Sequence, residues 1–239
     1  MAGRFGGRLY SNAPAVMDTS IDAGLRSYML SVYNYMASGV LLTGIVALYV
    51  STNENLMNVI FGTGLSWVVM LAPFAFILAM NFGINKMRAS TLQTLFWAFA
   101  AVMGISLSTI FITYTGTSVA KVFFISAGSF AGLSLYGYTT KKDLSPFRTF
   151  LVMGLIGLII AMIANMFIQS SGFDFIISIF GVLIFAGLTA YDTQMIKSMY
   201  YEADGLEAQS KKIIMGAVRL YLDFINLFLM LLRLLGNRN

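Results

Sequence analysis

The sequence contains no cysteine and no histidine among its 239 residues, and only 10% of the residues are charged. The absence of cysteine excludes disulfide bonds, thiolate nucleophiles, iron–sulfur clusters and zinc sites built on thiolates. The absence of histidine removes the side chain that most often changes charge near neutral pH. Proton chemistry in this protein must therefore depend on carboxylates whose surroundings alter their ionisation.

Charge is scarce because most of the chain is apolar, with 58% hydrophobic residues. Soluble domains carry roughly 25% charged residues, so lipid must be the solvent for much of this chain. The formal net charge is +5, and basic residues in a membrane protein usually set its orientation rather than bind nucleic acid. The composition therefore indicates a multi-pass protein whose first partner is the lipid bilayer, with no nucleic-acid partner expected.

Seven continuous apolar segments follow a polar N-terminal segment. Each is close to the roughly 20 residues that a helix needs to cross a ~30 Å hydrocarbon layer, whereas barrel strands alternate in pieces of about ten residues. We predict an all-α membrane protein with an uncleaved cytoplasmic tail, residues 1–26, and a seven-helix transmembrane domain, residues 27–239. The segments are 27–50, 59–80, 91–113, 118–138, 148–168, 175–196 and 213–235.

The orientation follows from the loops that carry lysine and arginine. In the seven-span arrangement twelve basic residues fall on the side of the N-terminus, and Lys121 alone falls on the other side before the C-terminal Arg233 and Arg238. We therefore expect the N-terminus in the cytoplasm. The C-terminus stays open, because a full last crossing would place Arg233 and Arg238 outside against the rule, while a partial crossing would not.

Two features predict how the helices pack. Gly128 and Gly132 have the GxxxG spacing that is typical of close contact between membrane helices. Because the seventh segment carries a polar stripe, we expect its Phe228 and Leu229 to meet lipid less than Phe96 and Phe99 of the third segment, which we expect to face lipid.

Apart from Lys121 and Arg148 at the starts of the fourth and fifth segments, the charged residues inside the apolar segments are Asp192 in the sixth, and Arg219, Asp223 and Arg233 in the seventh. Such groups are costly in hydrocarbon and usually face the bundle interior or a water-filled cavity. Arg219, Asp223, Asn226 and Arg233 recur at helical spacing, so they lie on one stripe of the last helix. A helix with this stripe should not face lipid, and we expect it inside the bundle.

The two aspartates differ in their expected depth. At ~1.5 Å per residue, Asp223 lies about 16 Å along the helix from Lys212, near mid-membrane, while Asp192 lies close to the cytoplasmic end of its helix. They meet only if the last helix is shifted or tilted. If they meet, both cannot easily ionise, and they share a proton. The alternative is a packing role, with Arg219 paired to Asp223 and Asp192 capping backbone groups.

Three motifs resemble a known family. They are GLTAYDTQ at 187–194, LYLDFINLF at 220–228 and LRLLG at 232–236. Together with the seven-span layout, they resemble the Bax inhibitor family, also called the transmembrane Bax inhibitor motif proteins. Short loops and methionine-rich helices favour a bacterial member in the inner (plasma) membrane.

The resemblance implies a seven-helix bundle whose last, short helix is enclosed by the other six. It also implies that Asp192 and Asp223 form a pH-sensitive pair that gates a calcium-leak pathway, with Ca²⁺ as a transiently bound, transported ion and no cofactor. Arg219, Asn226 and Arg233 would support the pair. The family's calcium-leak member has an arginine latch on its second helix, but the second segment here, from Val59 to Met80, carries no charge. Either Arg219 replaces that latch, or the gating mechanism of this protein differs.

Two other functions stay open. Some bacterial relatives modulate a membrane-bound AAA protease, so the protein could be a non-transporting regulator that binds such a partner. Two aspartates on neighbouring helices are also typical of intramembrane aspartyl proteases. Tyr191 and Asp192 fit the first half of that signature, but Asp223 lacks the required Gly-x-Gly before it. We therefore expect no enzymatic activity.

Overall fold

The computed structural model describes the backbone of residues 13–239 and the side chains from Ala23 onward. Within this part of the chain, seven helices are long and apolar enough to cross a membrane, which confirms the predicted all-α architecture. They are α1 (Ala13–Ser51), α3 (Leu65–Gly83), α4 (Ala89–Leu107), α6 (Gly116–Thr139), α7 (Arg148–Ile168), α8 (Ser171–Ser198) and α9 (Leu206–Leu235). Three short elements lie in the connections: α2 (Glu54–Phe61), α5 (Ile110–Thr113) and the 3-10 turn Ser145–Phe147.

Helix α1 begins at Ala13, inside the segment 1–26 that was predicted to precede the bundle. Residues 1–12 of that predicted tail lie outside the described residues. Two of the later membrane helices, α6 and α8, begin at polar capping residues between the apolar segments. Thr115 accepts a hydrogen bond from Ser118 N (3.3 Å) at the start of α6, and Ser170 accepts one from Phe173 N (3.3 Å) at the start of α8. These caps satisfy backbone donors that would otherwise lack partners.

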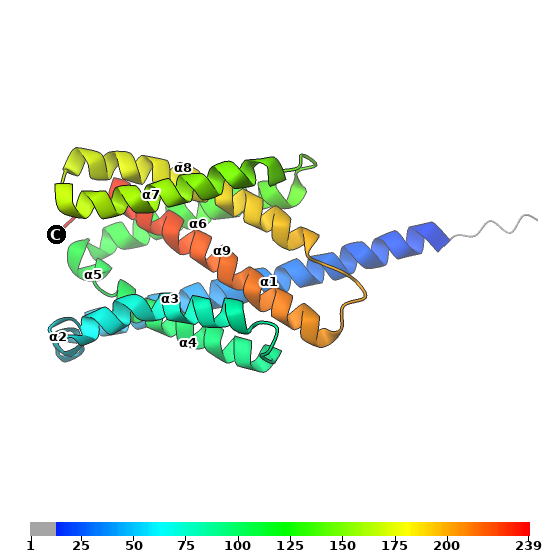
Figure 1. Ribbon diagram of the computed structural model, residues 1–239, viewed down its shortest axis with the longest axis horizontal. Coiled ribbons are helices and arrows are strands. Elements are labelled where there is room, and N and C mark those ends of the chain that lie inside the picture. The colour runs from blue at the N-terminus through cyan, green and yellow to red at the C-terminus, as the bar shows by residue number, and fades with distance from the viewer. Residues whose placement is uncertain (1–12) are drawn as a thin grey trace, which may run out of the picture.

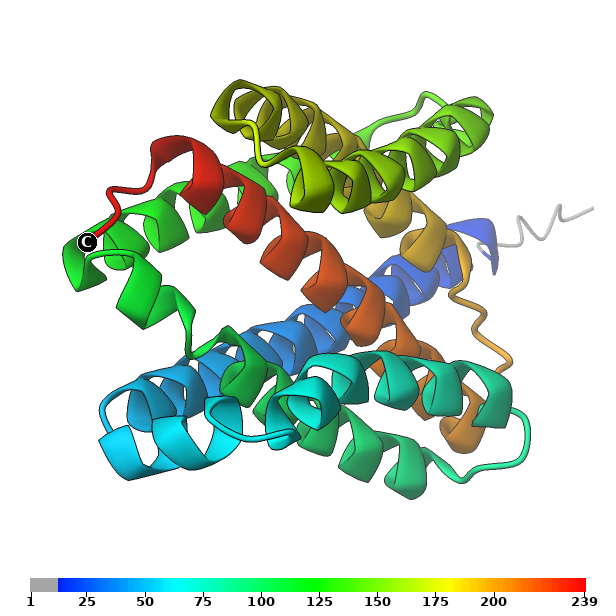
Figure 2. The ribbon, with the colours of Figure 1, turned by 60° about the vertical axis from the view of Figure 1, so that its left-hand side comes forward.

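Helix α9 runs obliquely through the centre of the molecule (Figure 1; Figure 2). It packs mainly against α1, α4, α6 and α8, while α3 covers α4 and α7 covers α8. In α9, 72% of the apolar window is buried, against 17% in α3 and 11% in α7. The predicted enclosed position of the last helix is therefore confirmed, although four helices rather than six make the direct contacts.

The last helix is not short, in contrast to what the resemblance implied. It has 30 residues, or about 45 Å at ~1.5 Å per residue, more than the ~30 Å of hydrocarbon. The apolar segment predicted only 213–235, but the helix continues through the polar residues before it. Lys211 and Glu207 form an (i, i+4) ion pair there, with 3.6 Å between Nζ and Oε1.

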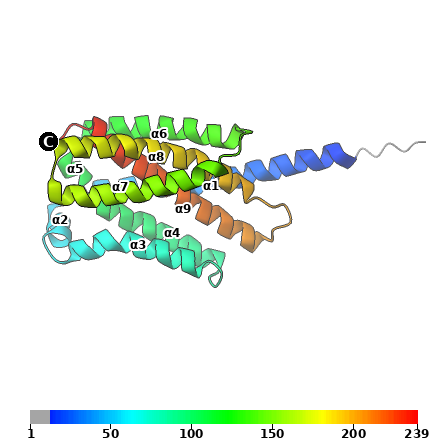
Figure 3. The same cartoon turned by 45° about the horizontal axis from the view of Figure 1, so that its top comes forward.

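Helix α9 crosses the bundle completely, so the C-terminus lies at the end opposite the start of α1 (Figure 1; Figure 3). Backbone hydrogen bonds hold this terminus against the α5–α6 connection: Thr115 N donates to Asn237 O (3.1 Å), and Asn239 N donates to Thr113 O (3.0 Å). Within the bundle, the last helix therefore runs from one end to the other.

Two packing predictions were wrong. A Cβ added at Gly128 or Gly132 would meet nothing within 4 Å, so the GxxxG spacing does not mark a helix contact here. The close approach is instead at Gly137, where an added Cβ would lie within van der Waals overlap of the backbone oxygen of Ala190 on α8. Phe96 and Phe99 are both fully buried rather than lipid-facing. They pack against Tyr221 of α9, with ring centroids 6.4 and 5.1 Å away.

Candidate functional site

The two motif aspartates meet where α9 crosses α8. Asp192 lies in the last two turns of α8 with its side chain 13% exposed, and Asp223 lies in the middle of α9 and is 5% exposed. Their carboxyl groups are within hydrogen-bonding reach of each other. The oblique path of α9 removes the difference in depth that the sequence indicated, because a tilted helix brings its middle to the level of the end of its neighbour.

One carboxyl oxygen in this pair has no donor. Asp223 Oδ2 is buried, and no hydrogen-bond donor of the described residues reaches it. An ionised carboxylate only accepts hydrogen bonds, whereas a protonated one can donate. A buried acceptor without a partner is costly. A single proton held between Asp192 and Asp223 would give both carboxyl groups a partner.

Arginine faces the pair from the exposed side. Arg219 Nη1 lies 3.8 Å from Asp192 Oδ1 and the same distance from Met195 Sδ, while the arginine side chain is 49% exposed. Arg148, at the start of α7, also acts electrostatically on Asp192. Arg219 thus forms its ion pair with Asp192 across the helices, and not with Asp223 on its own helix as the packing alternative required.

The remaining members of the predicted stripe lie apart from the pair. Asn226 donates through Nδ2 to Leu222 O (2.9 Å) of its own helix. Arg233 lies about two turns after Asn226, where its Nη1 is 3.7 Å from Asp174 Oδ1 at the start of α8. Arg238 approaches the other oxygen of Asp174 at 3.6 Å. The structure therefore brings Arg219 to the aspartates and leaves Arg233 at the opposite end of α9.

Tyr221 holds this part of α9 in place, a role that the sequence did not predict. Its hydroxyl is 2.7 Å from Thr43 Oγ1, and Thr43 Oγ1 donates to Ala100 O (2.7 Å). Because the single proton of Thr43 goes to Ala100, Tyr221 must be the donor to Thr43. One buried chain of hydrogen bonds thus joins α9 to α1 and α4, two residues from Asp223. The sequence could not predict this contact, because Tyr221 and Thr43 are isolated polar residues in two distant apolar segments.

The site offers few ligands for a metal. Over residues whose side chains the structure describes, no group of three or more acidic side chains lies close enough to hold a metal ion. Hard cations such as Ca²⁺ take six to eight oxygen ligands when they bind tightly. Two carboxyl groups could contact a passing cation, but they do not form a cage for a resident one.

The comparisons with known proteins agree with this arrangement. The family model described as "Inhibitor of apoptosis-promoting Bax1" matches residues 25–239. Protein RP147 of Rickettsia prowazekii is 49% identical over 219 residues, which are 92% of this chain and 93% of the relative. The inner membrane protein YbhL of Escherichia coli is 43% identical over 219 residues, 90% of this chain and 94% of the relative.

A more distant relative extends the same likeness. The membrane protein SpyM3_0260 of Streptococcus pyogenes is 33% identical over 226 residues, which are 94% of this chain and 98% of the relative. The match of the family model spans all seven membrane helices and both motif aspartates. The chain is an integral multi-pass membrane protein that belongs to the Bax inhibitor family.

Proposed function

We propose that this protein is a pH-sensitive calcium-leak pathway in a bacterial inner membrane, gated by Asp192 and Asp223. The observation that supports the proposal most strongly is the buried oxygen of Asp223 without a donor, directly beside a second carboxyl group. The relative YbhL is named an inner membrane protein. No resident cofactor and no catalytic step are part of the proposal, and Ca²⁺ is the transported ion.

Protonation sets the direction of gating. With one shared proton the two carboxyl groups attract, and α8 and α9 stay together at the crossing. Without it, two charges at ~4 Å repel by about 4 kcal/mol at an effective dielectric constant of ~20. The closed state therefore holds one proton more than the open state. Acid favours closure, and raising the pH favours leak.

The test is Ca²⁺ flux into proteoliposomes that contain the purified full chain, measured across a range of pH. We expect flux to rise with pH in the wild type. Asp192→Asn and Asp223→Asn should each remove that dependence. The double variant should show the same pH-independent flux as either single variant. Asp174→Asn is the matched control, because it neutralises an aspartate at the far end of α9. If both single variants keep the wild-type pH profile, the pair has only a structural role.

Arg219 takes the place of the latch in this proposal. It neutralises Asp192 from the exposed side at 3.8 Å, so its removal leaves the pair with excess negative charge. Exposed ion pairs contribute about 0–1 kcal/mol, which corresponds to at most about a fivefold rise in flux at neutral pH for Arg219→Gln. An unchanged or reduced flux would exclude Arg219 as the latch.

The proposal places the N-terminus in the cytoplasm. The connections α3–α4, α6–α7 and α8–α9 share one end of the bundle with the start of α1 (Figure 1), and eight of the 15 basic residues lie in these connections or within two helical turns of them. This bias is typical of the cytoplasmic side. A Lys86→Cys variant should react with a membrane-impermeant thiol reagent only after the inner face is opened. Reaction in intact cells would reverse the topology.

A second candidate is a regulator that binds a membrane-bound AAA protease or another membrane partner. It is supported by the α8–α9 connection, where Tyr201 is 65% exposed and Leu206 is 84% exposed. Two of the three acidic groups nearby already have partners, because Asp204 pairs with Lys212 at 2.6 Å and Glu207 accepts from Ala89 N at 2.6 Å, while Glu202 is exposed. Co-purification of a protease complex that persists in the Asp192→Asn/Asp223→Asn variant, without any Ca²⁺ flux in the wild type, would favour this candidate.

A further inference from the structure

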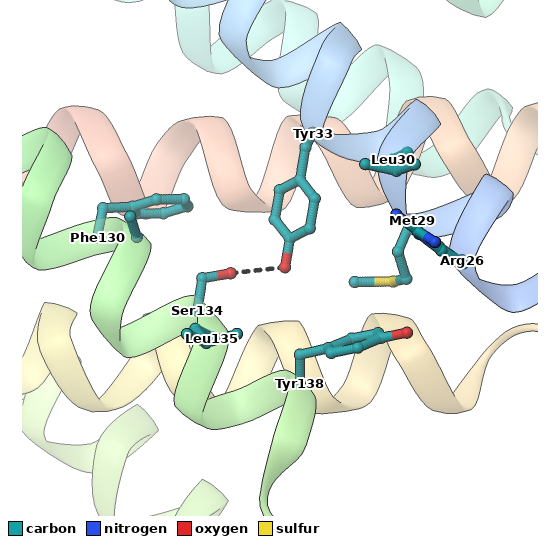
Figure 4. A pocket seen from close by; sticks show the side chains of 9 residues that line it. Arg26, Met29, Leu30, Tyr33, Phe130, Ser134, Leu135 and Tyr138 are labelled. Atoms are coloured by element: carbon teal, nitrogen blue, oxygen red, sulfur yellow. Dashed lines mark hydrogen bonds between the residues drawn. The ribbon is translucent and has the colours of Figure 1, made fainter. Parts of the chain in front are cut away.

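Helices α1 and α6 both pack against α9 but hardly touch each other. A cavity of about 550 Å³ lies between them, at the end of the bundle where α1 begins (Figure 4). This volume lies within the range of about 300–1,000 Å³ that is usual for small-molecule sites. It belongs to neither the aspartate pair nor its arginines.

The wall of the cavity is apolar and open to the surroundings. Its apolar lining residues are Met29, Leu30, Phe130, Ala131 and Leu135. Leu30 is 50% exposed and Leu135 is 63% exposed, and both lie on membrane-spanning helices. The medium that meets the cavity along most of its length is therefore lipid.

The polar groups in the middle of the cavity form one chain of hydrogen bonds. Tyr33 crosses from α1 towards α6, and its hydroxyl lies 2.7 Å from Ser134 Oγ (Figure 4). Ser134 Oγ lies 2.9 Å from Thr193 Oγ1, which donates to Thr189 O at 2.7 Å. Since each hydroxyl has one proton, Thr193 donates to Thr189, Ser134 to Thr193, and Tyr33 to Ser134. None of these three hydroxyls is left as a donor for a polar ligand, so the part of the ligand that lies beside them must be apolar.

The end of the cavity nearest the polar loops is cationic. Arg26 and Tyr138 line it there. Lys197 lies beside Tyr138, donating through Nζ to Tyr138 O at 2.8 Å and lying 4.9 Å from the centre of its ring. An apolar channel that ends in basic side chains at the membrane surface complements a chain with an anionic head.

We propose that the α1–α6 cavity binds an anionic phospholipid, with one acyl chain between Tyr33 and Leu135 and the phosphate at Arg26. In the proposed topology this lipid comes from the cytoplasmic leaflet. The Tyr33–Ser134–Thr193 hydrogen bonds form the floor beneath the chain and join it to α8, one residue from Asp192. The site thus recognises a lipid by charge at the head and by shape along the chain.

The molecule contains an internal control for charge. A second cavity of about 530 Å³ lies between α7 and α8, and its lining, which includes Gly154, Leu158, Ala161 and Phe180, has no charged residue. This second cavity should accept acyl chains without regard to the headgroup.

The test uses the full chain in phosphatidylcholine vesicles that contain a trace of photoreactive lipid, with a diazirine near the end of one acyl chain. The photoreactive lipid is either phosphatidylglycerol or phosphatidylcholine, and the labelled peptides are mapped by mass spectrometry. At the α1–α6 cavity we expect phosphatidylglycerol to label about fivefold more than phosphatidylcholine, the preference expected from about one favourable basic contact. At the α7–α8 cavity we expect equal labelling.

Two kinds of variant test the recognition of the lipid headgroup and the binding of the acyl chain separately. Arg26→Gln should remove the preference for phosphatidylglycerol at the α1–α6 cavity, and Arg88→Gln, at an exposed arginine of the same end, should keep it. Ala131→Trp should fill the cavity and reduce labelling by both lipids there, while labelling at α7–α8 continues and shows that the fold is intact. Equal labelling by the two lipids in the wild type, or a preference that survives Arg26→Gln, would overturn the proposal.

Discussion

The two ends of the α8–α9 pair hold opposite balances of charge. Where α9 crosses α8, the buried Asp223 and the mostly buried Asp192 have one arginine within contact distance, the half-exposed Arg219, while Arg148 acts on Asp192 from farther away. At the other end, one carboxylate, Asp174, lies between two arginines at 3.7 and 3.6 Å. In the proposed function, the excess acid at the first end holds a proton. The second has an excess base at the surface, which water and ions can solvate. In the proposed function, the first end is the one that responds to pH by changing helix contacts.

The two ends also differ in how rigidly α8 is held. An added Cβ at Gly137 would overlap the backbone oxygen of Ala190, whereas one at Gly181 would meet the end of the flexible Met230 side chain, 2.6 Å from its sulfur. The Ala190 backbone cannot move aside without shifting the helix, whereas the Met230 side chain can change its conformation. The end that carries the aspartates is therefore fixed against α6, and the opposite end has room to adjust.

The largest expected effect follows from that difference. Gly137→Ala should destabilise the protein by about 1–3 kcal/mol because of overpacking, despite the better helix propensity of alanine. Gly181→Ala should be nearly neutral, because Met230 can move. Thermal unfolding of the two variants in detergent measures the contrast. Equal stability of both variants would mean that the two ends are equally adaptable.

A smaller effect is expected at Tyr221, between the two ends. Tyr221→Phe removes the donor to Thr43, while Thr43 keeps its bond to Ala100 O. The cost should be about 1 kcal/mol, as for one net hydrogen bond. Thr43→Val is the matched comparison, because it leaves the buried Tyr221 hydroxyl without a partner and should cost more. The order is reversed if Tyr221 donates elsewhere in solution.

At the exposed end, Asp174→Asn breaks both arginine contacts at once. Because Arg233 and Arg238 are 40% and 63% exposed, the loss should stay below about 1 kcal/mol and shrink further in high salt. Unfolding measured at low and high salt tests this. A loss of several kcal/mol, independent of salt, would show that this end is not solvated as described.

The smallest effect concerns Asp143 in the exposed α6–α7 connection. Its carboxylate accepts a hydrogen bond from Ser145 N at 2.9 Å, and this contact lowers the pKa of Asp143 below its ordinary value. A lowered pKa stabilises the fold above the pKa of the unfolded chain, and the gain is lost as the pH falls through the folded value. Asp143→Ala should therefore lower the free energy of unfolding slightly at neutral pH. The variant should also lose less of that free energy than the wild type as the pH falls. If the variant and the wild type lose stability equally as the pH falls, this account is contradicted.

The sequence predicted the features that depend on composition along one helix. The seven apolar segments predicted the seven long apolar helices, and the stripe that contains Arg219 and Asp223 predicted that the last helix lies inside the bundle. It could not predict which stripe members meet, because that depends on the tilt of α9 relative to α8. The same limit explains Gly128 and Phe96: spacing shows that residues share a face, but only the neighbouring helices decide whether that face meets protein or lipid.

The central claim is that Asp192 and Asp223 hold one proton between them, and infrared spectroscopy of the carboxylic acid C=O stretch tests it most directly. In the reconstituted protein we predict a protonated-carboxyl band that decreases as the pH rises. The band should disappear in Asp223→Asn, where Asp192 is left beside Arg219, and it should remain in Asp174→Asn. A band that is unchanged in Asp223→Asn, or the absence of any titrating band in the wild type, would contradict the account.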